Sequence, residues 1–323
     1  MSTSATTSMS EIETERRIGG PGTSIVRDIP RIDLSSFEER KQEIADALWS
    51  AATEIGFFQV YNHGIPQDDI ERAFSLAEQF FALPTETKAA FHLKPGTNAG
   101  WEFREQVRPS TGTPDHKESF QITLPRMAGL WPHDADIAGF QGFLTQFEHQ
   151  NWVLGMKILS CFAMKLGFDE DFFTSRHEPS SPDYQCTLRL IHYMSMENAR
   201  PADFENWRAG AHSDFDCLTL LHQRAGEGGL QVCPGKDVDS GAWTDVVPAA
   251  GYATCNIGDM LMRWSDVKLL STLHRVRMPK PGEYLGERLS IPFFCQANRD
   301  AIIQGPDKKY APISAQNYLL ERL

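Results

Sequence analysis

Short apolar runs dominate the second half of the chain. From Tyr184 onward, turn residues separate stretches in which apolar positions either alternate with polar ones or follow one another without a break. Both patterns are typical of β-strands that are buried on one or both faces. About seven such runs within about 110 residues predict a sandwich or barrel of strands. The clearest runs are 186–193, 217–223, 228–232, 252–259, 260–264 and 288–295.

The first half carries a helical pattern instead. Apolar residues there recur every three to four positions over long stretches, which predicts helices that bury one face. The predicted helices cover 38–54, 67–83, 84–91 and 137–166, and a further helix is predicted over 314–323.

Three other segments of the first half are not helical in pattern. Residues 29–37 predict a short strand that leads into a serine-capped helix start, and 56–66 predict a buried strand that runs into a turn. The Gly- and Pro-rich segment 94–114 predicts a long loop, of the kind that closes over a bound substrate.

The ends of the pattern suggest how the chain is divided. Residues 1–28 are rich in Ser, Thr and Gly and have no sustained apolar period, so a disordered tail is expected there. No convincing linker follows. We therefore expect one domain over 29–323, with a helical and strand-containing part at 29–130 and a strand-rich core at 184–312.

Charge and cysteine content narrow the function classes. Lys and Arg total 31 against 43 Asp and Glu, and the resulting net charge of −12 argues against nucleic-acid partners and anionic membranes. No secretory segment and no run of about 18 apolar residues is seen, so a cytosolic location is expected. The six cysteines are scattered without a C-x-x-C pair and predict free buried thiols.

Candidate metal ligands occur in the strand-rich half. His212 and Asp214, in AGAHSDFDCLTLL, are separated by one residue, so on a strand both side chains point to the same face. His274, in STLHRV, lies 60 positions after Asp214, and hairpins of a barrel can fold it back into contact. Two imidazoles and one carboxylate on one side of a metal form the facial triad that holds iron(II) and leaves positions open. An isolated H-x-D pair also occurs where histidine only packs in a core, so support from elsewhere is needed.

That support comes from a second pair of residues. Arg288 and Ser290, in ERLSIPFF, follow His274 by 14 residues and again share one face of a predicted strand. A guanidinium can clamp a carboxylate with two parallel hydrogen bonds, and a hydroxyl adds a third. An anion anchor beside a metal suits a dicarboxylate that chelates the metal through its other end.

Together these motifs resemble the isopenicillin-N-synthase-like branch of the 2-oxoglutarate and iron(II)-dependent oxygenases, whose pattern is H-x-D, a distant H, and R-x-S. The segments GFFQVYNHGIP, LRLIHY, GGLQV and NIGDMLMRWSDVKLLSTLHRV also resemble that family. The resemblance implies a mainly β fold, a distorted double-stranded β-helix (jelly roll), flanked by N-terminal helices and one long helix. It also implies Fe(II) bound by His212, Asp214 and His274, with 2-oxoglutarate and O₂ as co-substrates and succinate and CO₂ as products.

The same resemblance assigns the co-substrate site. Arg288 and Ser290 would hold the distal carboxylate of 2-oxoglutarate, and Tyr193 falls where the family often places another hydroxyl, although a purely core role for Tyr193 stays open. Many plant relatives carry Asn two residues before that tyrosine. This chain has Ile191 there, so a hydrogen bond from that position is absent.

The expected substrate pocket follows from strand parity and from a narrower resemblance. Arg189 and Phe294 share the faces of Tyr193 and Ser290, and Phe215 follows the metal-binding aspartate directly. LRLIHY, DHKESF and FFCQAN resemble thymine-hydroxylase-like enzymes of fungi and fungal tailoring oxygenases, in which residues matching these three line the pocket with Asn298 nearby. Ordinary core packing is the alternative for each aromatic residue.

Further pocket contacts are expected from the long loop. Trp101 and Arg104 are candidate lid residues there, and the run from Lys117 to Phe120 is either a strand near the pocket or a solvated charged strand. The expected reaction is hydroxylation, or another oxidation, of a methyl or ring-adjacent C–H bond in a small cyclic or aromatic molecule. The chain is expected to act as a monomer or a weak homo-oligomer.

Three alternatives stay open at this point. An iron oxidase of the same family that does not use 2-oxoglutarate would also carry R-x-S. A small-ligand receptor could keep the fold without turnover, but its triad would not need to be intact. A zinc hydrolase could use the same ligands, although no general base is evident after H-x-D.

Overall fold

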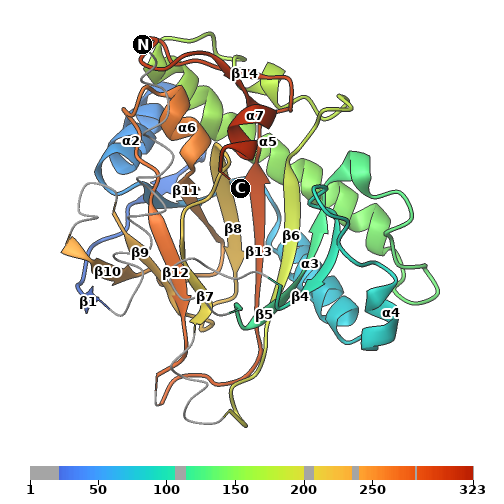
Figure 1. Ribbon diagram of the computed structural model, residues 1–323. Coiled ribbons are helices and arrows are strands. Elements are labelled where there is room, and N and C mark those ends of the chain that lie inside the picture. The colour runs from blue at the N-terminus through green and yellow to red at the C-terminus, as the bar shows by residue number, and fades with distance from the viewer. Residues whose placement is uncertain (1–21, 106–113, 200–206, 235–239, 281, 323) are drawn as a thin grey trace.

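Two antiparallel-rich sheets face each other and form the body of the molecule (Figure 1). The computed structural model describes residues 22–105, 114–199, 207–234, 240–280 and 282–322. The larger sheet has the order β2 (Arg31–Asp33), β3 (Phe57–Tyr61), β11 (Tyr252–Ile257), β8 (Leu218–Gln223), β13 (Arg288–Cys295), β6 (Thr187–Tyr193), β5 (Lys117–Ile122) and β4 (Gly100–Phe103). The smaller sheet has the order β1 (Thr23–Ser24), β10 (Ala242–Asp245), β9 (Leu230–Cys233), β12 (Leu273–Arg277) and β7 (Trp207–His212). A separate hairpin pairs β14 (Ile302–Ile303) with β15 (Ile313–Ser314).

A layer of helices covers the outer face of the larger sheet, as Figure 1 shows for α2, α3 and α5. The longest helix, α5, contacts β8 and β13, and its Gly155 lets the two layers approach closely, since a Cβ there would lie 2.5 Å from Sγ of Cys295. This sandwich of helices and sheet holds the main hydrophobic core. The helices are α2 (Lys41–Glu54), α3 (Gln67–Phe81), α4 (Thr85–Ala89), α5 (Phe140–Leu166), α6 (Asp259–Trp264) and α7 (Ala315–Leu320), with short 3₁₀ turns at Leu124–Arg126 and Thr174–Arg176.

Strand β13 shows how the sequence pattern creates two different faces. Leu289, Ile291 and Phe293 are buried in the core beneath the helices, because alternate side chains of a strand point to opposite sides of a sheet. The residues between them point into the space between the two sheets. The predicted jelly roll with N-terminal helices and one long helix is confirmed by this architecture.

The prediction of a strand over residues 260–264 is wrong. These residues belong to helix α6, which begins after Gly258, a residue in extended conformation, and carries an acidic residue in its first turn. Met260, Leu261 and Trp264 are buried together because they fall on one face at helical spacing. A five-residue apolar run is compatible with either period, so the pattern alone does not distinguish a strand from a short helix.

The predicted tail is too long. Residues 1–21 of the tail lie outside the described residues, but Thr23–Ser24 forms β1 and pairs in parallel with β10. The guanidinium of Arg27 donates to the hydroxyl of Thr244 at 2.9 Å. Residues 23–27 are therefore attached to the smaller sheet.

The N-terminal and loop predictions also need correction in detail. Helix α2 begins after Arg40 without a side-chain cap, since Ser35 bonds the carboxylate of Asp33 instead of capping the helix. Within the predicted loop 94–114, residues 100–103 form β4, which covers the edge of β5, and 106–113 lie outside the described residues.

The charged run at residues 117–120 is not a solvated strand. All of β5 is buried, and Lys88 and Trp101 donate hydrogen bonds to the carboxylate of Glu118 at 2.8 and 2.7 Å.

None of the helices in the described parts of the chain is both long and apolar enough to span a bilayer.

Candidate functional site

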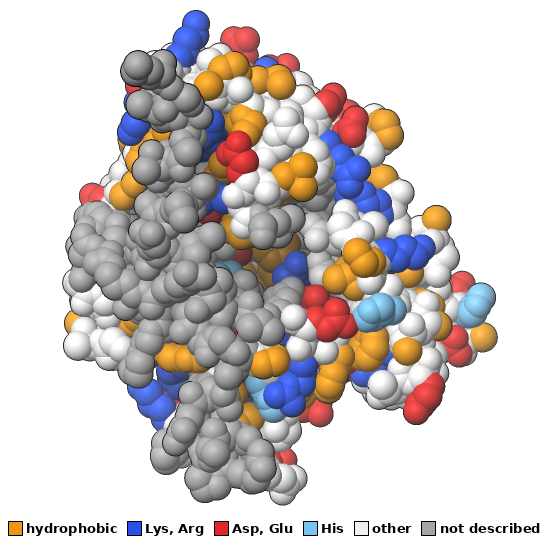
Figure 2. Space-filling model, viewed as in Figure 1, with side chains coloured by type: hydrophobic (Ala, Val, Ile, Leu, Met, Phe, Trp, Pro, Cys, Tyr) orange, Lys and Arg blue, Asp and Glu red, His pale blue; other side chains and the backbone are white. Residues whose placement is uncertain are grey.

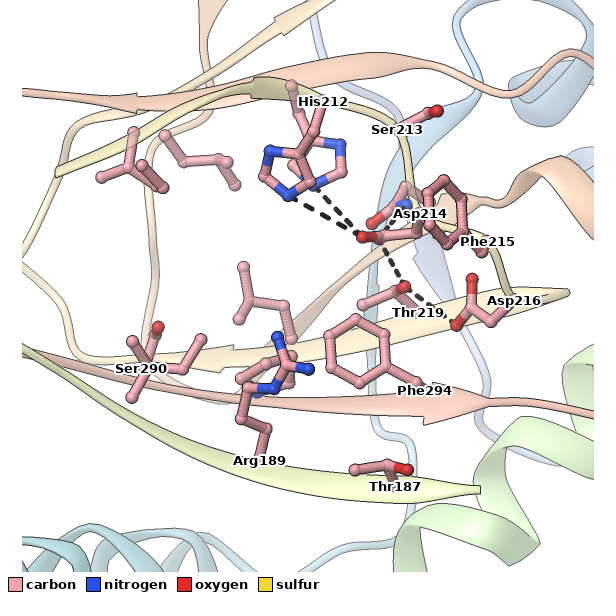
Figure 3. Close-up of a pocket in the computed structure, with 18 of the residues that line it drawn as sticks. Thr187, Arg189, His212, Ser213, Asp214, Phe215, Asp216, Thr219, Ser290 and Phe294 are labelled. Atoms are coloured by element: carbon pink, nitrogen blue, oxygen red, sulfur yellow. Dashed lines mark hydrogen bonds and ion pairs between the residues drawn. The ribbon is translucent and has the colours of Figure 1, made fainter. Parts of the chain in front are cut away.

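Three potential metal ligands converge between the two sheets. Strands β7 and β12 pair with His212 directly opposite His274, and the H-x-D segment brings Asp214 beside them. Oδ1 of Asp214 lies 3.9 Å from Nε2 of His212 and 3.7 Å from Nε2 of His274 (Figure 3). One ligand atom from each of the three residues lies within 4.8 Å of the others, so the set could hold one metal ion.

The backbone fixes which imidazole nitrogen faces the other ligands. Nδ1 of His212 lies 2.7 Å from the carbonyl oxygen of Gly210, and Nδ1 of His274 lies 3.2 Å from that of Thr272. A proton on Nδ1 satisfies each carbonyl and leaves Nε2 with a lone pair, which is the arrangement that metal-binding histidines require.

The carboxylate of Asp214 is held in a similar way. Its Oδ2 accepts hydrogen bonds from the hydroxyl of Thr219 at 2.7 Å and from the amide of Asn256 at 2.9 Å. Because both bonds use one oxygen, Oδ1 is directed toward the imidazoles.

A second carboxyl group, Asp216, lies beside this site. It is fully buried, and burial together with the nearby charge of Asp214 raises its pKa well above the usual value. Its Oδ2 lies 3.1 Å from the hydroxyl of Thr219. The hydroxyl of Thr219 thus lies within hydrogen-bond distance of both carboxyl groups.

The triad opens into a cavity of about 340 Å³ between the sheets. In Figure 2 the surface is hollowed near the centre of the view, where hydrophobic and basic side chains are visible inside. A volume of this size suits a small molecule together with a small co-substrate. Its lining includes Phe57, Thr187, Leu221, Leu230, Asn256, Val276 and Pro292 besides the residues discussed here.

Arg288 lies at the end of the cavity away from helix α6, next to Tyr193. The residue is 1% exposed, its Nε donates to the carbonyl of Glu227 at 3.0 Å, and its Cζ lies 4.7 Å from the centre of the Tyr193 ring. Its Nη1 is buried and has no hydrogen-bond partner among the described residues. A buried cationic donor without a partner is costly, so this atom fits a carboxylate bound in the cavity.

Ser290 and Tyr193 line the same cavity as Arg288. Strands β13 and β6 pair Arg288 with Tyr193 and Ser290 with Ile191, so the four residues form one patch of wall. The structure therefore brings together the metal-ligand set and the carboxylate anchor that the motifs predict.

Further along β6 and β13, the same wall carries the cation of Arg189 and the ring of Phe294, and Phe215 adds a second ring from the segment after Asp214. Arg189, Phe215 and Phe294 all line the cavity, and Figure 3 shows Arg189 and Phe294 pointing toward its centre. Cζ of Arg189 lies 5.0 Å from the centre of the Phe294 ring, and Nη2 donates to Gln121 at 2.8 Å.

Lys117 lines this cavity too and was not among the predicted site residues. Its Nζ lies 3.2 Å from Oδ2 of Asp115, and both side chains are buried. The signal that could have found it is the two-residue period of KESFQI, which places Lys117 on the face opposite Glu118.

Three predicted pocket residues are not brought to the cavity. Asn298 lies beyond β13 and donates from its side chain to the carbonyl of Glu178. Trp101 is buried against Glu118 on the outer face of the sheet, and Arg104 is exposed at the end of β4. The alternation of side chains along a strand explains the position of Trp101. In β4 it pairs with Phe120, whose side chain lies in the core under the helices.

Known protein families match both halves of the chain. Residues 29–134 match the N-terminal model of the non-haem dioxygenases in morphine synthesis, and 184–297 match the 2OG-Fe(II) oxygenase superfamily. The second match contains the triad, Arg288 and Ser290.

Similar proteins include enzymes and a solved complex. The 2-oxoglutarate-Fe(II) type oxidoreductase hxnY of Emericella nidulans is 31% identical, over 89% of this chain and 87% of that protein. A 1-aminocyclopropane-1-carboxylate oxidase of Dictyostelium mucoroides is 28% identical, over 86% and 84%. The full-length Neurospora crassa T7H, solved in complex with alpha-KG and thymine, is 31% identical with a TM-score of 0.80, over 91% of this chain and 96% of that one. This chain belongs to the 2OG-Fe(II) oxygenase superfamily and is a 2-oxoglutarate-dependent dioxygenase.

Proposed function

We propose that His212, Asp214 and His274 hold the iron(II) of this dioxygenase, and that Arg288 holds the distal carboxylate of 2-oxoglutarate. Ser290 and Tyr193 complete the co-substrate site. The observation that carries the proposal is the position of Arg288 Nη1, a buried donor without a protein partner, on the wall of the cavity that also contains the triad.

When bound, iron(II), 2-oxoglutarate and O₂ supply the oxidation, in which one oxygen atom enters a C–H bond of the substrate and the other enters succinate as CO₂ leaves. The protein supplies geometry. Gly210 and Thr272 hold the imidazoles with Nε2 toward Asp214, and Thr219 and Asn256 keep Oδ1 of Asp214 directed inward. The apolar residues Phe57, Leu221 and Phe294 around the cavity exclude water from the reacting groups.

Thr219→Val tests the support of Asp214. The substitution keeps the branched shape but removes the hydroxyl that donates to Oδ2. We expect the affinity for iron(II) to fall about tenfold, because groups that orient a metal ligand typically contribute 10- to 100-fold. Anaerobic titration of the apo protein with iron(II) measures the change, and an unchanged affinity would exclude this role for Thr219.

The substrate is proposed to be a small, flat, cyclic or aromatic molecule that is hydroxylated at a methyl or ring-adjacent carbon. Phe215 and Phe294 offer flat faces for stacking, and Arg189 offers hydrogen-bond donors to ring oxygens. The complex of Neurospora T7H with thymine supports this class, and makes pyrimidine bases the first compounds to test.

Phe215→Ala and Arg189→Ala are expected to uncouple substrate from turnover. Each should leave iron(II) and 2-oxoglutarate binding within about threefold of wild type, because neither side chain is among the proposed iron or 2-oxoglutarate ligands, and Arg189 is held by Gln121 and Phe294. Each should lower substrate-stimulated succinate formation about tenfold or more, as loss of a positioning contact does. An equal loss of 2-oxoglutarate binding would move these residues out of the substrate site.

One alternative mechanism is kept because a relative is named as a 1-aminocyclopropane-1-carboxylate oxidase. If such an oxidation occurred here, O₂ uptake would proceed without succinate. Succinate formed in step with O₂ uptake would argue against it, and O₂ consumption itself would separate the enzyme from a receptor or a zinc hydrolase.

Other expectations from the sequence stay predictions. They are a single domain over 29–323, a cytosolic location, the absence of nucleic-acid partners, and a monomeric or weakly associated state.

A further inference from the structure

The C-terminal segment, which comprises helix α7 and the residues after it, is bound to helix α6 through a buried ion pair. Nη2 of Arg322 lies 3.1 Å from Oδ2 of Asp259, with the two side chains 6% and 1% exposed. The hydroxyl of Tyr318 accepts from Arg322 and donates to the carbonyl of Asp259 at 3.0 Å. Two residues of the C-terminal segment thus contact one residue of α6.

The same aspartate contacts the metal motif. Ser213, between His212 and Asp214, donates from its hydroxyl to Oδ2 of Asp259 at 3.1 Å. The backbone amide of Asp259 donates to the carbonyl of Asp214 at 2.8 Å. Figure 3 shows the Ser213 side chain pointing away from His212 and Asp214, so it is free to make this contact on the outer side of the motif. The chain of contacts runs from Arg322 through Asp259 to both residues that follow His212.

The C-terminal helix also contributes to the cavity wall. Leu319, the residue after Tyr318, lines the cavity that contains the triad. Movement of α7 therefore changes two things together: the contacts of Asp259, and the enclosure of the space where substrate binds.

Removal of one partner from a buried ion pair leaves an uncompensated charge, which is strongly unfavourable. Undocking of α7 would separate Arg322 from Asp259 in this way. The carboxylate of Asp259 would then lose the cation that holds it, and its contact with the hydroxyl of Ser213 would be weakened. Undocking of the C-terminal helix would therefore remove one support of the metal motif, besides those that Thr219 and Asn256 give to Asp214.

We propose that docking of the C-terminal helix and binding of the metal stabilise each other, with Arg322 and Asp259 as positioning residues for the H-x-D motif. The proposal rests on the proposed function, since it takes His212, Asp214 and His274 as the metal ligands. It makes closure of the substrate cavity depend on the metal. A reactive site therefore forms only in enzyme molecules in which the metal is bound and the C-terminal helix is docked.

The test uses the full-length apo protein and cobalt(II), which binds like iron(II) without reacting. Hydrogen exchange of amides in 315–322 is measured with and without cobalt(II), and the cobalt(II) dissociation constant is measured for wild type, Arg322→Met and Arg322→Lys. Arg263→Met is the matched control, because it removes a nearby guanidinium that lies over the Tyr318 ring and donates to the carbonyl of Ala311.

The expected results follow from reciprocity between two coupled equilibria. In wild type, cobalt(II) should slow exchange in 315–322 about tenfold, and Arg322→Met should raise the dissociation constant by about the same factor. Arg322→Lys keeps the positive charge but loses the separate donors to Tyr318, so its dissociation constant should fall between those of wild type and Arg322→Met, and Arg263→Met should stay within about twofold of wild type.

Two outcomes would overturn the coupling. If wild type binds cobalt(II) while hydrogen exchange of the amides in 315–322 is unchanged, helix docking and metal binding are independent. This measurement needs only the wild-type protein, so it remains decisive even when Arg322→Met fails to fold. If the well-folded Arg322→Met binds cobalt(II) like wild type, Arg322 does not position the motif. Failure of wild type to bind cobalt(II) at all would instead remove the proposed metal site, and the coupling with it.

Discussion

Asp214→Ala is expected to bind iron(II) at least about a hundredfold more weakly than wild type and to form no succinate above the metal-free background. The variant removes the one anionic ligand of the set, and it also leaves the donors of Thr219 and Asn256 without their acceptor. Loss of a supporting residue alone costs about 10- to 100-fold in metal affinity, so loss of the ligand itself should exceed that range.

The control is Asp245→Ala, which removes a partly exposed carboxylate at the end of β10 in the smaller sheet. Iron(II) affinity is measured by anaerobic titration and succinate by direct assay. His274→Ala should behave like Asp214→Ala. Wild-type turnover in either ligand variant would show that the metal, if required, is bound elsewhere.

Arg288→Lys is expected to raise the 2-oxoglutarate concentration needed for half-maximal turnover about 10- to 100-fold, with iron(II) affinity unchanged. Lysine keeps the charge but cannot present two parallel donors to a carboxylate. A charge-assisted hydrogen bond contributes about 1.5–3 kcal/mol, which corresponds to that range.

Arg208→Lys is the matched control for this prediction. Arg208 is also a buried arginine near Arg288, and burial lowers its pKa to about 10, yet its guanidinium donates to the carbonyl of Gly286 and it does not line the cavity. The two variants therefore differ in contact with the co-substrate rather than in charge or burial. If the 2-oxoglutarate concentration needed for half-maximal turnover rose equally in both variants, the effect would be a general electrostatic one rather than the loss of a specific contact.

Much of the site follows from the period of two along strands. The spacings of His212 and Asp214 and of Arg288 and Ser290 each place two side chains on one face, and the structure has them lining one cavity. The same parity puts Arg189 and Phe294 there. What the spacing does not contain is the pairing of β7 with β12, which sets His274 opposite His212 through contacts between residues far apart in the chain.

The predictions that failed share a different cause. Residues 260–264 form a helix because Asp259 and Met260 bond the carbonyls of Asp214 and Asp216, which are remote in sequence. Trp101 turns away from the cavity because β4 pairs with β5 in a register that the loop composition does not reveal. Asn298 is held by the carbonyl of Glu178 after the chain leaves β13. In each case the local sequence pattern permits several conformations, and a hydrogen bond to a residue remote in sequence determines which one is adopted.

The most direct test of the central claim is an anaerobic titration of the apo protein with iron(II), followed by 2-oxoglutarate, while the visible absorption of the iron chelate is recorded. The account predicts a weak charge-transfer band that saturates at one equivalent of iron(II), disappears in Asp214→Ala, and requires more 2-oxoglutarate in Arg288→Lys. Absence of the band in wild type, or its persistence unchanged in both variants, would contradict the assignment of this cavity as the iron and 2-oxoglutarate site.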